Sequence, residues 1–176
     1  MTRIPALPAL ATALLAASLA GCANPPHFDA FQPATPADYD GPTANVADEV
    51  QAVGPQRLHV FEITHVDGRR LASSSTATRR AGQGGSMTVT PVALTNELAV
   101  RPTRVRLQAA TQYASPVVAL SQPTCRTVGD VDFTPRAGAR YAVRGRIDNG
   151  ACEAWIEDLA TGQPATDKVS GPGTAR

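Results

Sequence analysis

The sequence predicts an all-β domain, a single β-sandwich of about seven to eight strands, preceded by a signal helix and a proline-rich tether. Three observations support this fold class. Segments rich in β-branched residues alternate between apolar and polar positions along residues 43–162. Turn residues separate these segments about every dozen positions. No window after residue 21 has a helical period. We therefore expect an immunoglobulin-like or transthyretin-like topology first, and an open barrel second.

The first expected hairpin is centred on Asp67-Gly68. After a short segment at 43–50, Arg57 to Val66 (RLHVFEITHV) combines β-branched and aromatic residues, and 69–78 forms a plausible partner strand. Asp-Gly accepts the positive φ values of a type I′ turn, so the pattern predicts a hairpin. The next segment, 78–86 (TRRAGQGGS), contains three glycines and two arginines and is expected to be a mobile loop.

The clearest alternation in the chain spans Thr103 to Tyr113, after a weaker expected strand at 87–94. Val105 and Leu107 fall on one side of this strand and Arg106 on the other, which is typical of a half-buried strand. Residues 115–124 are interpreted as a long connection containing a short apolar piece.

A second hairpin is expected with its turn near Gly138. In that register Asp132 faces Arg144 and Asp130 faces Arg146, so outward charges meet opposite charges across the pair. These arginines are therefore interpreted as solvated partners of aspartates.

The last expected strand follows the turn at 148–150. It runs from Cys152 to Leu159 (CEAWIEDL), with Cys152, Ala154 and Ile156 facing inward. Residues 163–176 are rich in glycine, proline, threonine and serine and are expected to form a flexible tail.

An apolar run from Ala6 to Ala20 precedes the expected domain. It is too short for an ordinary membrane span and has the length of a secretory signal. The run ends at Leu19-Ala20-Gly21-Cys22, which resembles the lipobox of bacterial lipoproteins.

This resemblance implies a lipid anchor. Cys22 Sγ would take a diacylglyceryl group, a lipoprotein signal peptidase would cut between Gly21 and Cys22, and the new amino group could then be acylated. Ala23, rather than an aspartate, follows the cysteine; by resemblance to the sorting pattern of enteric bacteria, this suggests the outer membrane, with the domain facing the periplasm. No further cofactor is expected.

The expected organisation therefore has four parts: a removed signal peptide at 1–21, the lipidated cysteine and tether at 22–42, the sandwich at 43–162 and the tail at 163–176. Residues 23–42 contain five prolines and no hydrophobic period, which is typical of an extended tether. At about 3.1 Å per residue, some twenty residues could reach roughly 60 Å.

The two remaining cysteines, Cys125 and Cys152, form an even pair. Disulfides are the usual state of paired cysteines in an oxidising compartment, so a bridge is predicted. A metal site would need two further ligands that do not appear nearby, and a redox pair would usually lie closer together in sequence.

Without Arg3 the mature chain has 15 cations and 15 anions, so no overall attraction to nucleic acid or anionic lipid is expected. The charges are segregated, because residues 50–146 hold thirteen bases and five acids. Arginine richness is first of all typical of a GC-rich genome; recognition of phosphate or carboxylate groups is the second explanation.

Catalytic motifs are missing from the sequence: there is no Gly-x-Ser-x-Gly, phosphate loop or His-Glu-x-x-His. His59 and His65 lie about 20 Å apart along one strand, too far to share a metal ion. Ser73, Ser74 and Ser75 have no histidine at a recognisable spacing. We therefore expect neither an enzyme nor a metal site.

Four stretches weakly resemble the small β-sandwich lipoproteins of proteobacterial envelopes, a group with no known activity. They are Val66-Asp67-Gly68, Tyr113-Ala114-Ser115-Pro116, Gly138-Ala139-Arg140-Tyr141-Ala142-Val143-Arg144-Gly145 and Ala154-Trp155-Ile156-Glu157-Asp158.

Two functions are compatible with these features. The first is a membrane-anchored envelope lipoprotein whose non-catalytic sandwich contacts another envelope or periplasmic protein. The alternative is a module that binds an anionic envelope polymer, lipopolysaccharide or peptidoglycan, through arginines. The candidate contacts are Arg69, Arg70, Arg79, Arg80, Arg104 and Arg106, and we expect Arg79 and Arg80 to matter more than Arg144 and Arg146.

Replacing the anchor residue tests the lipoprotein hypothesis. Because only a thiol can accept the diacylglyceryl group, Cys22→Ser should abolish labelling by a fatty-acid probe and leave an uncut or soluble form. Label that persists on the variant would contradict the hypothesis.

Overall fold

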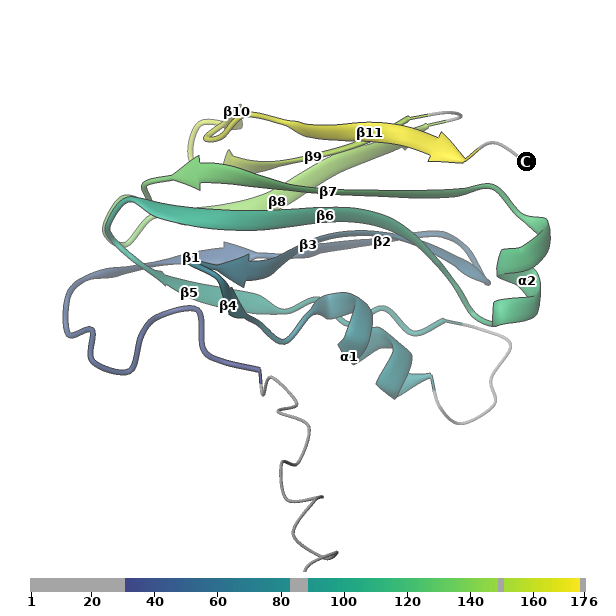
Figure 1. Ribbon diagram of the computed structural model, residues 1–176, viewed down its shortest axis with the longest axis horizontal. Coiled ribbons are helices and arrows are strands. Elements are labelled where there is room, and N and C mark those ends of the chain that lie inside the picture. Colours follow the sequence, from purple (N-terminus) through teal and green to yellow (C-terminus); the bar gives the residue numbers. More distant parts are fainter. Residues whose placement is uncertain (1–30, 83–88, 149–150, 175–176) are drawn as a thin grey trace, which may run out of the picture. The chain divides into compact units, whose positions relative to one another are not determined.

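The computed structural model describes residues 31–82, 89–148 and 151–174, which contain eleven strands and two short helices (Figure 1). The predicted signal peptide and Cys22 lie outside these residues. Within the described ranges, no helix is both long enough and apolar enough to cross a membrane.

The strands form two packed sheets, consistent with the predicted β-sandwich. The five-stranded sheet contains β2 (Glu49–Gly54), β3 (Arg57–Val66), β4 (Arg69–Arg70), β6 (Thr103–Tyr113) and β7 (Thr124–Phe133). The six-stranded sheet contains β1 (Thr43–Ala47), β5 (Thr95–Ala99), β8 (Arg140–Asp148), β9 (Ala151–Asp158), β10 (Gln163–Pro164) and β11 (Val169–Thr174). The ladder order is β2-β3-β6-β7-β11-β9-β8-β1-β5, so β11 joins the two sheets along one side (Figure 1).

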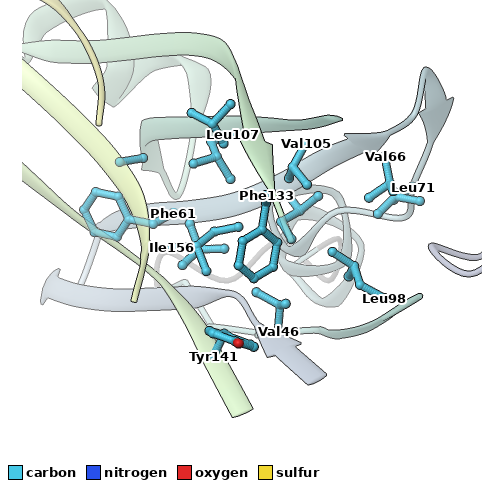
Figure 2. Close-up of a cluster of buried hydrophobic side chains, with 14 of the residues drawn as sticks. Val46, Phe61, Val66, Leu71, Leu98, Val105, Leu107, Phe133, Tyr141 and Ile156 are labelled. Carbon is cyan, nitrogen blue, oxygen red and sulfur yellow. The ribbon is translucent and has the colours of Figure 1, made fainter. Parts of the chain in front are cut away.

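The hydrophobic core lies between the sheets (Figure 2). Phe61, Ile63, Val105 and Leu107 point into it from the five-stranded sheet, and Val46, Val143 and Ile156 from the other; all seven are fully buried. The ring of Phe133 meets that of Tyr141 edge-on, with the centroids 5.0 Å apart. Aromatic pairs favour this arrangement because the positive edge of one ring meets the negative face of the other.

The strands with the strongest alternation are confirmed. β3 and β6 have the predicted bounds and pair antiparallel along their length. The Asp67-Gly68 hairpin is also confirmed, since both residues have positive φ, 50° and 79°, and Val66 pairs with Arg69. Its second strand, however, ends at Arg70.

The predicted absence of helices after residue 21 is wrong. Helix α1 (Ser74–Ala81) replaces the end of the expected strand and the start of the expected loop, and α2 (Pro116–Ser121) lies in the expected long connection. Ser73 caps α1, because its Oγ accepts a hydrogen bond from Thr76 N. The strand predicted at 87–94 is also wrong: residues 89–94 are not in a strand, and β5 begins at Thr95.

The predicted hairpin around Gly138 is wrong because β7 and β8 lie in different sheets. β7 pairs with β6, which places Asp130 opposite Arg106. β8 pairs with β9. Arg144 therefore binds Glu49 at 2.9 Å and Glu157 at 3.2 Å. Arg146 lies 3.7 Å from Asp148. Both arginines have acidic partners, as expected, but not the predicted ones.

The expected flexible tail forms structure instead. Strand β11 pairs with β9 through Val169–Pro172 and with β7 through Gly173 and Thr174. Glycine permits the close approach, because a Cβ at Gly129 on β7 would lie 2.6 Å from Val169 Cγ1. The last strand is therefore an internal member of the ladder.

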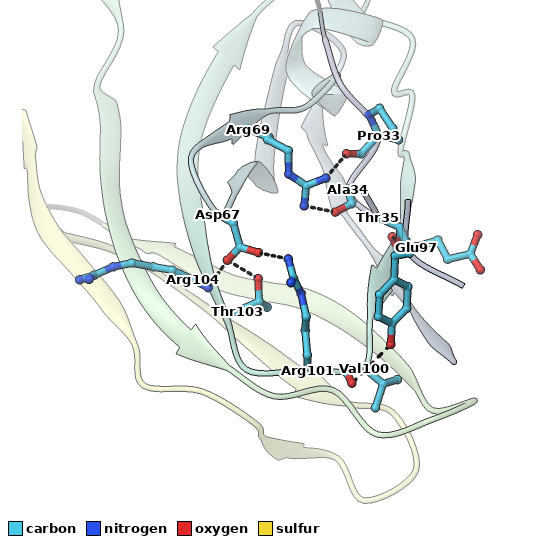
Figure 3. Close-up of polar contacts among 11 residues, drawn as sticks. Pro33, Ala34, Thr35, Asp67, Arg69, Glu97, Val100, Arg101, Thr103 and Arg104 are labelled. Atoms are coloured by element: carbon cyan, nitrogen blue, oxygen red, sulfur yellow. Dashed lines mark hydrogen bonds and ion pairs between the residues drawn. The ribbon is translucent and has the colours of Figure 1, made fainter. Parts of the chain in front are cut away.

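The described part of the expected tether, residues 31–42, lies on the domain (Figure 3). Arg69 donates hydrogen bonds to the carbonyl oxygens of Pro33 and Ala34 at 3.2 and 2.7 Å. Ala34 is buried in the core cluster. Tyr39 Oη donates to Val100 O at 3.5 Å, just after the end of β5. The compact unit accordingly begins at Phe31.

The predicted disulfide joins Cys125 on β7 to Cys152 on β9. Both half-cystines are buried, and each pairs with a residue of β11, Gly173 for Cys125 and Gly171 for Cys152. The disulfide therefore links β7 of one sheet to β9 of the other, beside β11, the strand that pairs with both.

Removing the bridge should destabilise the fold. Closing a loop of about 28 residues contributes about 3–4 kcal/mol in the chain-entropy description. Cys125→Ala combined with Cys152→Ala should therefore lower Tm by roughly 10 °C in thermal unfolding. Reduced wild-type protein should behave like the variant, and an unchanged Tm in both would contradict the expectation.

Candidate functional site

A groove of about 530 Å³ opens on the outer face of the five-stranded sheet, beside α1. Four arginines from four different elements line it. They are Arg70 on β4, Arg79 on α1, Arg106 on β6 and Arg126 on β7. The two exposed apolar side chains at its rim are Phe31 and Val128.

Three of these arginines lack an acidic partner in the described ranges: Arg70, Arg79 and Arg126 form no ion pair there. The guanidinium of Arg70 lies 5.1 Å from the ring centroid of Phe31. Arg79 Nη2 donates to Thr76 Oγ1 at 3.0 Å. Each guanidinium has five N–H donors, so most donors remain free for a ligand.

Arg106 is partly neutralised. Its Nε and Nη2 donate to the two oxygens of Asp130, at 2.7 and 3.1 Å. Arg104 lies 3.8 Å from the same carboxylate. Arg106 therefore contributes less positive electrostatic potential to the groove than Arg70, Arg79 or Arg126 does.

His65 also lines the groove and responds to its positive charge. Burial lowers the pKa of this imidazole, and the charges of Arg106 and Arg70 lower it further, while Asp130 opposes the change. His65 is therefore predominantly neutral at neutral pH, and its ring can accept or donate a hydrogen bond without repelling a cation.

The floor of the groove is a buried carboxylate, Glu62 on β3, whose side chain is fully covered. It accepts hydrogen bonds from Ser75 N at 2.8 Å and Ser75 Oγ at 2.7 Å. Gln108 Nε2 donates to it at 2.7 Å, and Gln108 Oε1 accepts from Arg126 Nη2 at 3.0 Å. The side-chain amide of Gln108 therefore binds both the carboxylate of Glu62 and the guanidinium of Arg126, and this network holds Arg126 at the groove.

A second buried carboxylate, Asp48, holds the start of α1. Its Oδ1 accepts from Ile63 N at 3.0 Å, and its Oδ2 lies 2.6 Å from Ser74 Oγ. Ser74 Oγ accepts in turn from Leu94 N at 2.9 Å. Burial raises the pKa of Asp48 to about 7, with the charge of Glu62 adding to the increase, although the bonds from Ser74 and Ile63 oppose it.

The buried face of α1 consists of hydroxyl side chains, Ser74, Ser75 and Thr78. Thr78 Oγ1 accepts from Val92 N at 3.0 Å and lies 3.3 Å from Val92 O. The helix is therefore attached to the sheet through hydrogen bonds and not through an apolar stripe, and this attachment orients Arg79 toward the groove.

The structure separates the candidate arginines predicted from sequence. Arg70 and Arg79 line the groove, whereas the guanidinium of Arg69 is committed to the carbonyl groups of Pro33 and Ala34. Arg80 does not line the groove; its guanidinium lies 5.9 Å from the ring centroid of Phe31.

Sequence reasoning missed Arg126 as a site residue. It follows Cys125 in a strand whose alternation places Cys125 inward and Arg126 outward. The alternation of this strand could have indicated that Arg126 faces outward. Its place in the groove beside α1, however, depends on the pairing of β6 with β7.

Metal binding has no support in the described residues: no group of three or more histidine, cysteine or acidic side chains there could hold a metal ion. A scan against protein-family models, a search of curated proteins and a search of solved structures found no match. The chemistry of the groove is therefore the basis of any functional assignment.

The raised pKa of Asp48 predicts a pH-dependent stability. As pH rises from about 4 to about 7, unfolded Asp48 loses its proton while the folded state keeps it, so the free energy of unfolding falls. Asp48→Asn mimics the protonated acid and should flatten this dependence. Relative to wild type, the variant should gain about 2–3 kcal/mol between about pH 5 and about pH 8.

Urea unfolding of both proteins at the two pH values measures this difference. Asp38→Asn, at an exposed acid, is the control and should follow the wild-type curve. Parallel curves for wild type and Asp48→Asn would show that Asp48 does not titrate differently in the two states.

Proposed function

We propose that this protein is a membrane-anchored envelope lipoprotein whose non-catalytic β-sandwich binds an anionic group of an envelope component in the arginine groove. The observation that carries the proposal is the convergence of Arg70, Arg79 and Arg126, which have no acidic partner in the described ranges, on one cavity. The proposal favours the anionic-ligand hypothesis, lipopolysaccharide or peptidoglycan, over the protein-contact hypothesis.

The groove has the properties that such binding needs. Its volume, about 530 Å³, lies within the range of small-ligand sites. Guanidinium groups match the planar, two-oxygen edges of carboxylate and phosphate groups. Glu62 on the floor does not repel the ligand strongly, because three hydrogen bonds from Ser75 and Gln108 compensate its charge.

The proposed location has two supports. The Cys125–Cys152 bridge is compatible with an oxidising compartment. The Leu19-Ala20-Gly21-Cys22 sequence resembles a lipobox. We include in the proposal a lipid anchor on Cys22, an outer-membrane location facing the periplasm, and an immunoglobulin-like or transthyretin-like topology, which stays a prediction.

A contact with another envelope protein is the second candidate, and α2 supports it. Val117 and Leu120 on this helix are 75% and 69% exposed. Neighbouring exposed apolar side chains of this kind occur at protein interfaces.

Two neighbouring arginines provide the test. Arg79→Ala should weaken binding to lipopolysaccharide or to peptidoglycan about tenfold, because it removes charge-assisted hydrogen bonds. Arg80→Ala, one residue away and outside the groove, should change binding little. Added salt should weaken wild-type binding steeply.

The measurement is sedimentation of the secreted chain from Ala23 onward with each polymer. Equal retention of wild type, Arg79→Ala and Arg80→Ala would contradict groove binding. Polymer binding that is insensitive to salt would contradict recognition through arginines.

A further inference from the structure

Resting on the proposed function, we propose that the arginine groove binds the phosphate of a lipid head group in the same bilayer that holds the Cys22 anchor. Three features support this ligand class: the small number of residues between Cys22 and the first residue of the domain, the position of Phe31, and the mixed character of the rim.

The chain between the anchor and the domain is short. Residues 31–42 lie on the sandwich through the hydrogen bonds of Arg69, of Thr35 to Glu97 O and of Tyr39 to Val100 O (Figure 3). Between the proposed lipid on Cys22 and the first residue of the domain, Phe31, the chain advances by nine residues. Nine fully extended residues span at most about 30 Å, half of the reach expected for a tether that ends at residue 42.

The chain enters the domain at the groove itself. Phe31, the first described residue, lines the cavity, and its ring lies beneath the guanidinium groups of Arg70 and Arg80 at 5.1 and 5.9 Å. The length of chain between Cys22 and Phe31 sets an upper limit on the distance between the anchor and the domain. Because Phe31 lines the groove, this limit applies directly to the rim of the groove.

The rim combines apolar and cationic side chains. Phe31 is 38% exposed and Val128 is 46% exposed, and both lie beside the arginines. A lipid head group offers a phosphate joined to an apolar glyceryl-acyl part, which matches such a rim. A peptidoglycan carboxylate on a polar sugar-peptide chain leaves the two apolar side chains unused.

The overall charge makes the binding local. The mature chain has equal numbers of cations and anions, so the whole surface does not attract an anionic bilayer. Among the described residues, we expect attraction where several arginines without an acidic partner line one cavity, as Arg70, Arg79 and Arg126 do. Each such arginine near an anionic surface contributes on the order of 1 kcal/mol to the free energy of binding.

The proposed anchor also keeps head groups near the groove at an effective concentration in the millimolar range, so a modest affinity of the groove for a head group suffices.

The experiment uses the secreted chain from Ala23 onward, without lipid, which retains the whole compact unit from Phe31. Flotation is measured with vesicles of phosphatidylcholine alone, with about one third phosphatidylglycerol, and with oleate at equal surface charge. We expect binding to the phosphatidylglycerol vesicles, weaker binding to the oleate vesicles, and competition by inorganic phosphate.

The groove variants decide whether binding is specific. Arg79→Ala combined with Arg126→Ala should weaken vesicle binding about tenfold or more. Phe31→Ser should weaken it several-fold. The matched control, Arg140→Ala with Arg146→Ala, removes the same charge from exposed positions of β8 in the other sheet and should bind like wild type. Thermal unfolding verifies that each variant is folded; if the double variant is not, Arg126→Gln replaces it.

The other outcomes separate this inference from the proposed function. Equal loss in groove and control variants, or equal binding to phosphatidylglycerol and oleate vesicles, would overturn the phosphate inference. Arg79-dependent binding to peptidoglycan without vesicle binding would overturn the lipid source and leave the proposed function intact. No binding to either polymer or vesicle would refute both.

Discussion

The burial of two carboxylates beside helix α1, Glu62 on β3 and Asp48 between β1 and β2, is the constraint on which the site depends. Glu62 is fully covered and Asp48 nearly so, and a buried acid without hydrogen-bond donors is strongly destabilising. Helix α1 supplies those donors through Ser74 and Ser75. The helix is therefore held in one position on the sheet, and in that position Arg79 lines the same groove as Arg126. Gln108 couples the two walls because it binds both Glu62 and Arg126.

A second constraint joins the sheets. Strand β11 pairs with both β7 and β9, and the Cys125–Cys152 bridge links the same two strands beside it. The groove lies on β3, β6 and β7, so Arg70, Arg106 and Arg126 are carried by the sheet that this bridge joins to the other, and Arg79 by the helix beside it. A chain with few aromatic residues has a core of modest side chains, and a covalent link between the layers compensates for the apolar area that larger residues would bury.

Features encoded by local sequence were predictable, and those that depend on distant partners were not. The bounds of β3 and β6 and the Asp67-Gly68 turn follow from alternation and backbone preference within a few residues. Helix α1 has a polar buried face, so no apolar period indicates it; its signals were the Ser73 cap and the arginines of its last turn. The tail was misread because glycine and proline usually indicate disorder, whereas Gly171 and Gly129 permit close packing of β11 against β7.

The same limit applies to the site. Sequence placed Arg70, Arg79 and Arg80 among the candidate contacts, but it could not distinguish Arg79 from Arg80, because that choice depends on a helix that directs only one of the two toward the groove. Nor could it show that the tether ends at Phe31, since that depends on Arg69 binding the carbonyl groups of Pro33 and Ala34. This one arginine, which sequence suggested as a ligand contact, instead holds residues 33 and 34 on the domain. In the proposed lipoprotein, this contact would reduce the number of residues between an anchor on Cys22 and the groove.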